Sequence, residues 1–506
     1  MSKISIAFFL FLILFSSCNN TKLHEKELDL ENFSQLRQDV FNVDYRKIHD
    51  NIETLMMTDG RPISIDRRFV KYYSDGNPFI WIDRLGVKNR VDTLLKILRC
   101  ADFYGLDTNM LRIGQIENDL KLIRTLNFNT DDINVIMARL EYNLTRAYFR
   151  YSIGVAFGFI NPDHLYNTLE KYDVDSITTR FRQLSDLRVK RPDSIFYNKV
   201  INYAFHDSIS YFLRIIHPKD DLYENLLERL NNDDFSKNDR MKILCNIERC
   251  RWKLKDTKQN LLEKYIEVNI PSFSLRAIDK GKVLSMRVGC GTLKSKTPLL
   301  ASQITRMDVN PQWIVPKSIS KGFANNYSYM HKMGMFVFDK REGKLPPEEA
   351  SYSKIMAGKQ YIIQAGGPKN SLGRIIFRFD NNFSVFLHDT SSPWIFKRDR
   401  RAVSHGCVRV EKPYELALFL FDKRDENLEE RLKYSMSVDF VNDKDSLEKK
   451  GIKTECLVST IPVNPSVPLF ITYYTVYYDN DGKIVNYQDV YGYDEVLAER
   501  LKPFVK

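Results

Sequence analysis

The sequence predicts an α+β protein in which an N-terminal α-helical domain precedes a mostly antiparallel β domain. Over much of residues 34–256, apolar residues recur at spacings of three and four, the period of a helix with one buried face. From Lys264 onward, apolar and polar residues alternate in short runs between turn sequences, which is typical of hairpins. At 506 residues the chain exceeds what one core usually organises, so several domains are expected.

Residues 1–18 have the layout of an export signal. Lys3 precedes an apolar run over residues 4–15, and two serines then lead to Cys18. The run is short for a membrane span, and it resembles a bacterial lipoprotein signal in which Cys18 is acylated. An ordinary cleaved signal or an N-terminal anchor is the alternative. We therefore expect an exported protein, and with lipidation a membrane-anchored lipoprotein of the periplasm or cell envelope.

The charge distribution restricts the partners. The net charge is +11, and the basic residues are spread along the chain. Such a pattern favours weak attraction to anionic surfaces, including acidic cell-wall polymers. A nucleic-acid binder would more often show a concentrated basic patch or a known motif, so no nucleic-acid partner is expected.

The helical domain, residues 34–256, shows its pattern best over residues 131–151. Residues with N-cap chemistry precede that segment, and Asn161-Pro162 ends the neighbouring stretch. A second helix is predicted from Tyr223 to Leu230. This half contains no group of residues suited to catalysis, so we interpret it as a scaffold. The apolar face of the first helix is formed by Ile133, Ile136, Met137, Leu140, Leu144, Ala147, Tyr148 and Tyr151.

Residues 262–425 are predicted to form the second domain. Alternating runs over residues 264–270 and 284–288 enclose a hairpin turn, and residues 375–387 read as another hairpin. One helix is expected from Pro413 to Leu420.

Two further segments belong to this half. Residues 317–361 lack periodicity and are either a lid over a groove or an irregular connection. Residues 426–506 are expected to form a C-terminal β-hairpin extension that packs on the second domain, with strands at residues 470–478 and 483–487.

The chemistry is concentrated between His388 and Arg409. A thiol becomes a good nucleophile when an imidazole takes its proton, and the imidazole can later return a proton to a leaving amine. A third group must hold the imidazole tautomer, and backbone N–H groups must meet the oxyanion. Cys407 supplies the thiol and His388 the base, and Gly406 permits close backbone approach. Acyl transfer with these parts requires no cofactor.

Simpler roles for the same residues compete with catalysis. A single cysteine is more often a small buried apolar residue, and a single histidine is more often structural. His388, His405 and Cys407 are also zinc-type ligands. However, the His-x-Cys spacing is too close for the usual zinc pattern and no fourth ligand stands out, so no metal is predicted.

The motif resembles that of the L,D-transpeptidase family, whose catalytic domain is also called YkuD. The family signature is a His, a spacer, and then Ser/Thr-His-Gly-Cys with an apolar residue and Arg or Asn, which matches His388 and residues 404–409. Residues 367–373 resemble the family's Gly-Pro-x-Asn-x-Leu-Gly loop. Residues 246–252 resemble an Asn-x-Glu-Arg-x-Arg-Trp signature of the large, scaffold-bearing YcbB-like subfamily.

The resemblance implies a peptidoglycan L,D-transpeptidase of cell-wall biogenesis. Cys407 would attack the carbonyl before the terminal D-Ala of a stem tetrapeptide, and an amine of a neighbouring stem would resolve the thioester into a 3→3 cross-link. His388 would act as general base, oriented by the backbone carbonyl of Asp389. Backbone N–H groups around His405, Gly406 and Cys407 would meet the oxyanion.

The resemblance also implies that Ser404, Arg409 and Asn370 bind substrate. Arg409 suits a carboxylate because its guanidinium can bind one in bidentate fashion, although a surface ion pair is the alternative. Expected partners are stem peptides, and a membrane through lipid at Cys18. Two other functions stay open: an L,D-carboxypeptidase or hydrolase using the same cysteine, and a non-catalytic wall-binding lipoprotein.

Overall fold

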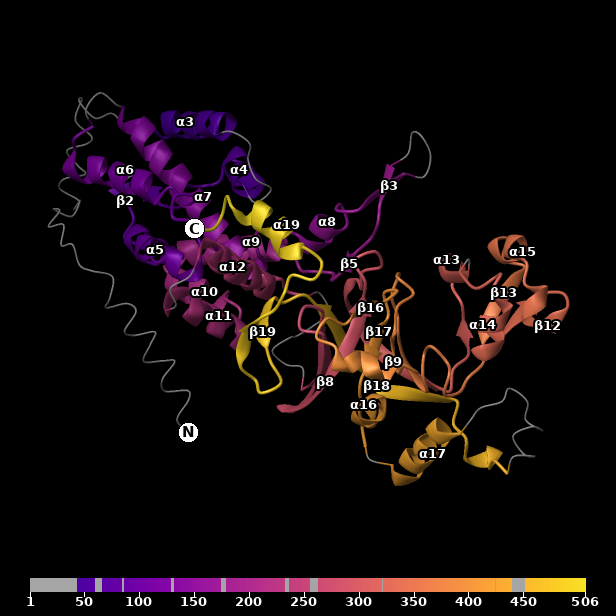
Figure 1. Cartoon of the computed structure of the whole chain (residues 1–506). Helices are drawn as coiled ribbons and strands as arrows, with labels where there is room; N and C mark the ends of the chain where they lie inside the picture. The colour runs from indigo at the N-terminus through magenta and orange to yellow at the C-terminus, as the bar shows by residue number, and fades with distance from the viewer. Residues whose placement is uncertain are drawn as a thin grey trace. The chain divides into compact units, whose positions relative to one another are not determined.

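The computed structural model divides into two compact units, which are described separately (Figure 1). The predicted signal peptide and the lipidation site Cys18 lie outside the described residues, which are 43–59, 66–83, 86–128, 132–173, 179–232, 236–254, 263–320, 322–423, 425–438 and 451–506. The first unit comprises Met1–Asn161, Lys190–Lys253 and Glu495–Lys506, and the second comprises Pro162–Val189 and Leu254–Asp494.

The first unit is helical and is organised around α7 (Ile133–Phe157). The helix predicted at this place is confirmed: it starts after Asp132, whose carboxylate accepts from the Asn134 amide, and it ends at Gly158, where φ is +74°. Nearly all of its residues are buried, because neighbouring helices surround it. The helices of this unit are α3 (Tyr45–Thr58), α4 (Asp66–Ser74), α5 (Arg90–Arg99), α6 (Ile113–Thr125), α9 (Ser194–Phe205), α10 (Ile209–Ile215), α11 (Asp221–Asn232) and α12 (Lys237–Arg251).

A buried carboxylate on α7 anchors the segment that precedes α5. Glu141 is fully buried and accepts from the Tyr73 hydroxyl at 2.6 Å and from the Ile80 and Trp81 amides at 2.5 and 2.8 Å. These donors satisfy the oxygens, but burial still raises the pKa of the Glu141 carboxyl to about 7. The side chain therefore titrates close to physiological pH.

This carboxyl should make the stability of the helical unit depend on pH. Because its folded pKa lies above the unfolded value of 4.5, the folded state binds more protons between those values, and stability falls as pH rises. We expect Glu141 to account for a loss of about 2 kcal/mol between pH 5 and pH 8. Denaturant unfolding of the full chain, followed by tryptophan fluorescence, should show a flatter pH dependence for Glu141→Gln. An unchanged slope in that variant would contradict the assignment.

The second unit is built on a sheet that closes on itself. Its strands follow the order β14-β15-β17-β8-β7-β6-β18-β9-β5, and β14 also pairs with β9. The apolar side chains of alternate residues fill the interior, which explains the predicted alternation. The strands are β5 (Ser185–Asp186), β6 (Lys264–Asn269), β7 (Ser274–Asp279), β8 (Lys282–Gly291), β9 (Leu299–Val309), β14 (Ile375–Phe379), β15 (Leu387–His388), β16 (Ala402–Ser404), β17 (Val408–Val410) and β18 (Thr460–Thr472).

The mostly antiparallel prediction is confirmed, with notable parallel exceptions. β15 runs parallel to β17, and β6 runs parallel to β18. The helix predicted near Pro413 is present as α16 (Pro413–Leu420), followed by α17 (Glu426–Ser437).

The C-terminal segment differs from the prediction. The run at residues 470–478 is not one strand, because Phe470–Thr472 end the long strand β18, which lies between β6 and β9. Only β19 (Val476–Tyr478) and β20 (Ile484–Asn486) form the hairpin. The segment therefore supplies a strand of the closed sheet, and the last helix, α19 (Tyr493–Leu501), leads into the first unit. Another difference is that residues 162–189 belong to the second unit.

Residues 317–361 are a folded element and not an irregular connection. A four-stranded sheet has the order β10-β13-β11-β12, and it encloses a small core with the short helices α13 (Lys317–Ser320), α14 (Tyr327–Lys332) and α15 (Tyr352–Met356). Its gating role stays a prediction. The strands are β10 (Trp313–Ile314), β11 (Met335–Asp339), β12 (Gly343–Leu345) and β13 (Gln360–Gln364).

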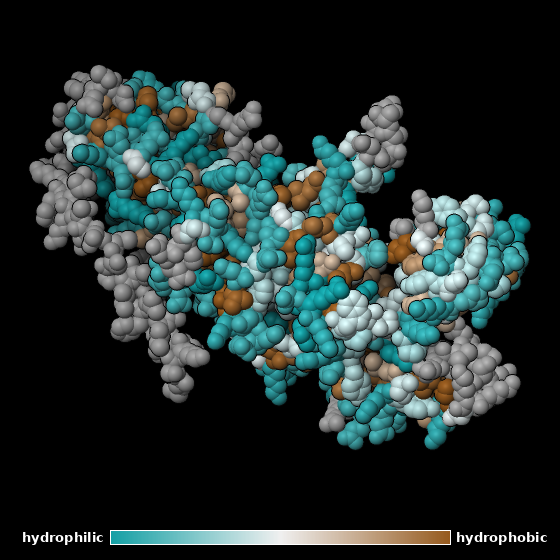
Figure 2. All heavy atoms as spheres, viewed as in Figure 1, coloured by the Kyte–Doolittle hydropathy of each residue, from teal (hydrophilic) through white to brown (hydrophobic). Residues whose placement is uncertain are grey.

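Figure 2 shows mainly hydrophilic residues on the face in view, with hydrophobic residues in separate small patches. Such scattered patches are normal on a protein surface. In the part of the chain that the structure describes, every helix is too short or too polar to span a bilayer.

Candidate active site

Two short parallel strands bring the predicted nucleophile and base together. In the pairing of β15 with β17, Leu387 lies opposite Val408 and His388 lies opposite Arg409. Leu387 and Val408 are fully buried on the inner face, so the alternate residues His388 and Arg409 belong to the outer face. Cys407 precedes Val408 and shares that outer face. The strand spacings place its Cα about 8 Å from that of His388.

The His388 imidazole is buried and held in one tautomer. Its Nδ1 lies 2.5 Å from the backbone oxygen of Asp389, and a carbonyl can only accept. Nδ1 therefore carries the proton and leaves Nε2 as the basic nitrogen. Burial lowers the pKa of His388 to about 3, with the Arg409 charge adding to this effect and the Asp389 and Leu372 carbonyls opposing it. The ring is thus neutral near pH 7.

The Cys407 thiol is also neutral at rest. Burial raises its pKa to about 11, against the lowering effects of the Phe386 amide and of the Arg378 and Arg409 guanidinium groups. Among the described contacts no hydrogen bond joins this thiol to the His388 imidazole. The resting site therefore holds a protonated thiol and a neutral imidazole. The thiol proton must move to the imidazole when Cys407 attacks a substrate carbonyl.

Thiol alkylation should report this resting state. Below its pKa the thiolate fraction rises tenfold per pH unit, so the rate at Cys407 with iodoacetamide should rise about tenfold per unit from pH 7 to pH 10. The modified residue can be identified by peptide mass spectrometry. A rate that levels off below pH 8 would show a preformed thiolate and would contradict the neutral pair.

The turn that presents Cys407 is fixed by Ser404. The Ser404 hydroxyl donates to the Cys407 carbonyl at 2.5 Å and accepts from the Gly406 amide at 3.1 Å. Gly406 has φ of +120°, a conformation that requires glycine. Ser404 is 3% exposed and its hydroxyl is occupied, so we assign it to positioning; its predicted contact with substrate stays a prediction.

The same turn determines which amides can meet an oxyanion. The Gly406 amide already donates to the Ser404 hydroxyl. It is therefore not one of the amides that can stabilise the oxyanion, contrary to the prediction. The amides of His405 and Cys407 donate to no acceptor among the hydrogen bonds described for this region, so they are the donors that the turn offers. The His405 side chain itself is exposed.

Thr297 supports the turn from outside the sequence motif that contains Cys407. Its buried hydroxyl donates to the Gly406 carbonyl and accepts from the Gly291 amide, both at 2.8 Å. Tyr491 extends this link, because its hydroxyl accepts from the Thr297 amide at 3.1 Å and donates to the Gly291 carbonyl at 2.7 Å. No sequence spacing reveals contacts between residues 109 and 194 positions apart.

Asn370 organises the loop beside His388. Its carboxamide donates to the backbone oxygens of Pro311 at 3.0 Å and Ala365 at 2.8 Å, and it accepts from the Leu372 amide at 2.8 Å. The side chain is 1% exposed, which gives it a role in ordering the loop. Its predicted contact with substrate stays a prediction.

Arg409 is a cation without a neutralising partner among the residues that the structure describes. Its buried Nε makes no hydrogen bond, and within the described residues no carboxylate lies in ion-pair distance of its guanidinium. Arg378, the other cation near Cys407, is paired with Asp308 at 2.7 Å. The alternative of a surface ion pair at Arg409 is therefore not observed, and the side chain remains available for an anionic group.

Metal-ligating side chains do not gather at this site. Among the residues that the structure describes, His, Cys, Asp and Glu form no group of three that could hold a metal ion.

Comparisons with known proteins identify two domains in this chain. Residues 263–423 match the model of the L,D-transpeptidase catalytic domain, YkuD, and residues 69–230 match that of a scaffold domain. A Haemophilus influenzae protein named "Putative L,D-transpeptidase" is 27% identical over 238 residues, or 46% of this chain and 45% of that protein. The match thus spans about half the length of this relative.

Two solved structures are also similar. An L,D-transpeptidase from Mycobacterium smegmatis is 13% identical, with a TM-score of 0.19, over 42% of this chain and 58% of that chain. An Enterococcus faecium L,D-transpeptidase is 14% identical, with a TM-score of 0.16, over 32% of this chain and 47% of that chain.

Proposed function

We propose that this chain, which carries an L,D-transpeptidase catalytic domain behind a scaffold domain, forms 3→3 cross-links in peptidoglycan through a thioester on Cys407. The observation that carries the proposal is the parallel pairing of β15 with β17, which sets a neutral imidazole and a thiol on one face of the sheet. A neutral His388 with its proton on Nδ1 is the form that can accept a proton at Nε2.

The first half-reaction is acylation. Cys407 Sγ bonds to the carbonyl carbon of the third residue of a tetrapeptide stem while its proton moves to His388 Nε2. The bond to the terminal D-Ala nitrogen then breaks, and that nitrogen takes the proton from His388. The His405 and Cys407 amides stabilise the oxyanion between these steps.

The second half-reaction is transfer. An amine of a neighbouring stem gives a proton to His388 and bonds to the thioester carbon, after which the carbon–sulfur bond breaks and the thiolate is reprotonated. Arg409 orients the donor stem through a carboxylate, which is supported by the absence of an internal partner for this cation among the described residues. Export and a lipid anchor at Cys18 would bring the enzyme to its polymer.

The test is intact mass spectrometry of the full chain after exposure to a tetrapeptide stem or a carbapenem. We expect a covalent adduct located on Cys407 in the wild type and none in Cys407→Ala. Cys456→Ala is a matched control, because this cysteine is partly exposed and remote in sequence from the motif. Absence of the adduct, or an adduct on another residue, would refute the proposal.

Product analysis separates transfer from hydrolysis, since both pass through the same thioester. Cross-linked dimers of the stem support the transpeptidase. Tripeptide alone would instead indicate an L,D-carboxypeptidase.

A further inference from the structure

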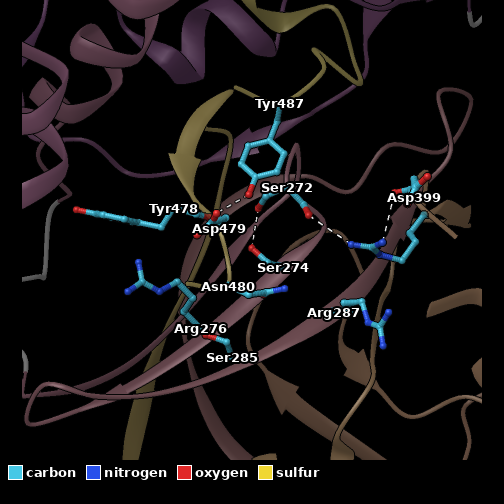
Figure 3. Close-up of a pocket in the computed structure, with 11 residues that line it drawn as sticks. Ser272, Ser274, Arg276, Ser285, Arg287, Asp399, Tyr478, Asp479, Asn480 and Tyr487 are labelled. Atoms are coloured by element: carbon cyan, nitrogen blue, oxygen red, sulfur yellow. Dashed lines mark hydrogen bonds between the residues drawn. The ribbon is translucent and has the colours of Figure 1, made fainter. Parts of the chain in front are cut away.

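A pocket of about 270 Å³ lies on the closed sheet, and Cys407 is not among the residues that line it (Figure 3). Its floor consists of two cross-strand pairs from β7 and β8, in which Ser274 faces Arg287 and Arg276 faces Ser285. One wall is the β19–β20 hairpin and the other is the connection that leads into β16. This volume is close to that of small-molecule sites in other proteins.

The pocket and the nucleophile share one face of the sheet. Gly289 of β8 lies opposite Arg409 of β17, and alternate residues of a strand point to the same side. The floor of the pocket therefore faces the same side as Arg409. Strand spacings place Arg409 about 8 Å from Arg287 and about 16 Å from Arg276, measured between Cα atoms.

All side chains that line the pocket carry a polar group. Every residue that lines the pocket is a serine, arginine, aspartate, asparagine or tyrosine. An apolar ligand would displace water from these groups without replacing the lost hydrogen bonds. The pocket therefore suits a ligand rich in hydrogen-bonding groups.

The charges of the lining largely cancel. Arg287 is already paired with Glu411 at 2.5 Å, and Arg401 uses its guanidinium on backbone carbonyls, including that of Phe273 at 3.1 Å. Asp399 and Asp479 would repel a multiply charged anion such as phosphate. A ligand with neutral hydroxyl and amide groups fits this balance better than a strong anion.

Three lining side chains keep open hydrogen-bonding capacity. In the described structure, the Ser285 hydroxyl, the Asn480 carboxamide and the Asp399 carboxylate have neither a hydrogen bond nor an ion pair. They come from β8, the hairpin turn and the connection before β16, and Figure 3 shows Asn480 between the hairpin and the strands. Arg276 lies over the Tyr478 ring at 4.6 Å, and its N–H groups add donors.

The geometry points to a saccharide-binding site. Neighbouring hydroxyls of a sugar both donate and accept, which matches a set made of a hydroxyl, a carboxamide, a carboxylate and a guanidinium. Its identification with the glycan strand of peptidoglycan rests on the proposed function. A glycan held about 8 to 16 Å from Arg409, by the same strand spacings, would keep its attached peptides near Cys407 at high local concentration.

The experiment measures binding of a β-1,4-linked N-acetylglucosamine tetramer to the full chain by calorimetry. The test variant is Ser285→Ala combined with Asn480→Ala, because neither side chain has a partner among the described residues whose loss would disturb folding. We expect binding about tenfold weaker than that of the wild type. Lys282→Ala, an exposed change on the same strand outside the pocket, should bind within about twofold of the wild type.

Three results would overturn the assignment of a saccharide site. The double variant could bind the tetramer as tightly as the wild type, the wild type could fail to bind it, or inorganic phosphate could displace it. Cys407→Ala should retain binding, which separates this site from the nucleophile. If Cys407 forms no adduct with a tetrapeptide while the double variant loses tetramer binding, the proposed function fails and the saccharide site stands. If the adduct forms but the tetramer does not bind, the saccharide site fails and the proposed function stands.

Discussion

Replacement of His388 by alanine is expected to slow acylation of Cys407 about 1,000-fold at pH 7. The thiol has a pKa of about 11, so only a small fraction is thiolate without a base. General-base catalysis by a positioned imidazole typically contributes about 10²- to 10⁴-fold. Single-turnover formation of the carbapenem adduct, followed by mass spectrometry, measures this step directly.

The pH dependence distinguishes a lost base from a damaged fold. In His388→Ala the residual rate should rise about tenfold per pH unit up to pH 10, since hydroxide then generates the thiolate. His164→Ala, which removes an exposed histidine of the same unit, should acylate at the wild-type rate. If His388→Ala acylates normally at pH 7, or does not recover at high pH, His388 is not the base.

Local chemistry allowed several elements to be predicted from the sequence. α7 follows from its apolar spacing and from Asp132 as N-cap, and the β7–β8 hairpin follows from the turn at Lys280-Gly281. These features depend on residues close together in the chain. For the same reason, the sequence motif pointed to Cys407 and its adjacent glycine as candidates.

The parallel pairings could not be predicted in this way. The register of β15 against β17 and of β18 against β6 joins segments that are distant in sequence, and apolar alternation says nothing about which strand is the neighbour. The end of strand β18 therefore looks like part of a hairpin in the sequence. Contacts of Ser404 and Asn370 with backbone atoms were equally hidden, because a polar residue in a motif can contact either the substrate or the turn.

The buried hydroxyl of Thr297 offers the sharpest test of how the turn is supported. In Thr297→Val the volume is nearly conserved, but the Gly406 carbonyl loses its donor and the Gly291 amide loses its acceptor. Unsatisfied buried groups cost about 1 to 3 kcal/mol each, so the turn should shift away from the conformation that these two hydrogen bonds hold. We expect acylation to slow about 100-fold, because small displacements of reacting groups carry penalties of this size.

The conservative variant decides whether the hydroxyl itself matters. Thr297→Ser keeps both hydrogen bonds and should recover most of the rate, whereas Thr297→Val should lower the limiting rate of acylation with little change in the substrate concentration for half-saturation. The limiting rate should change more than the half-saturating concentration because the Thr297 hydroxyl contacts the turn and not the substrate pocket. Its loss therefore alters the geometry of attack by Cys407 more than it alters substrate binding in the ground state. Equal losses in the two variants would show that the methyl packing, and not the link from Gly291 to Gly406, holds the nucleophile in place.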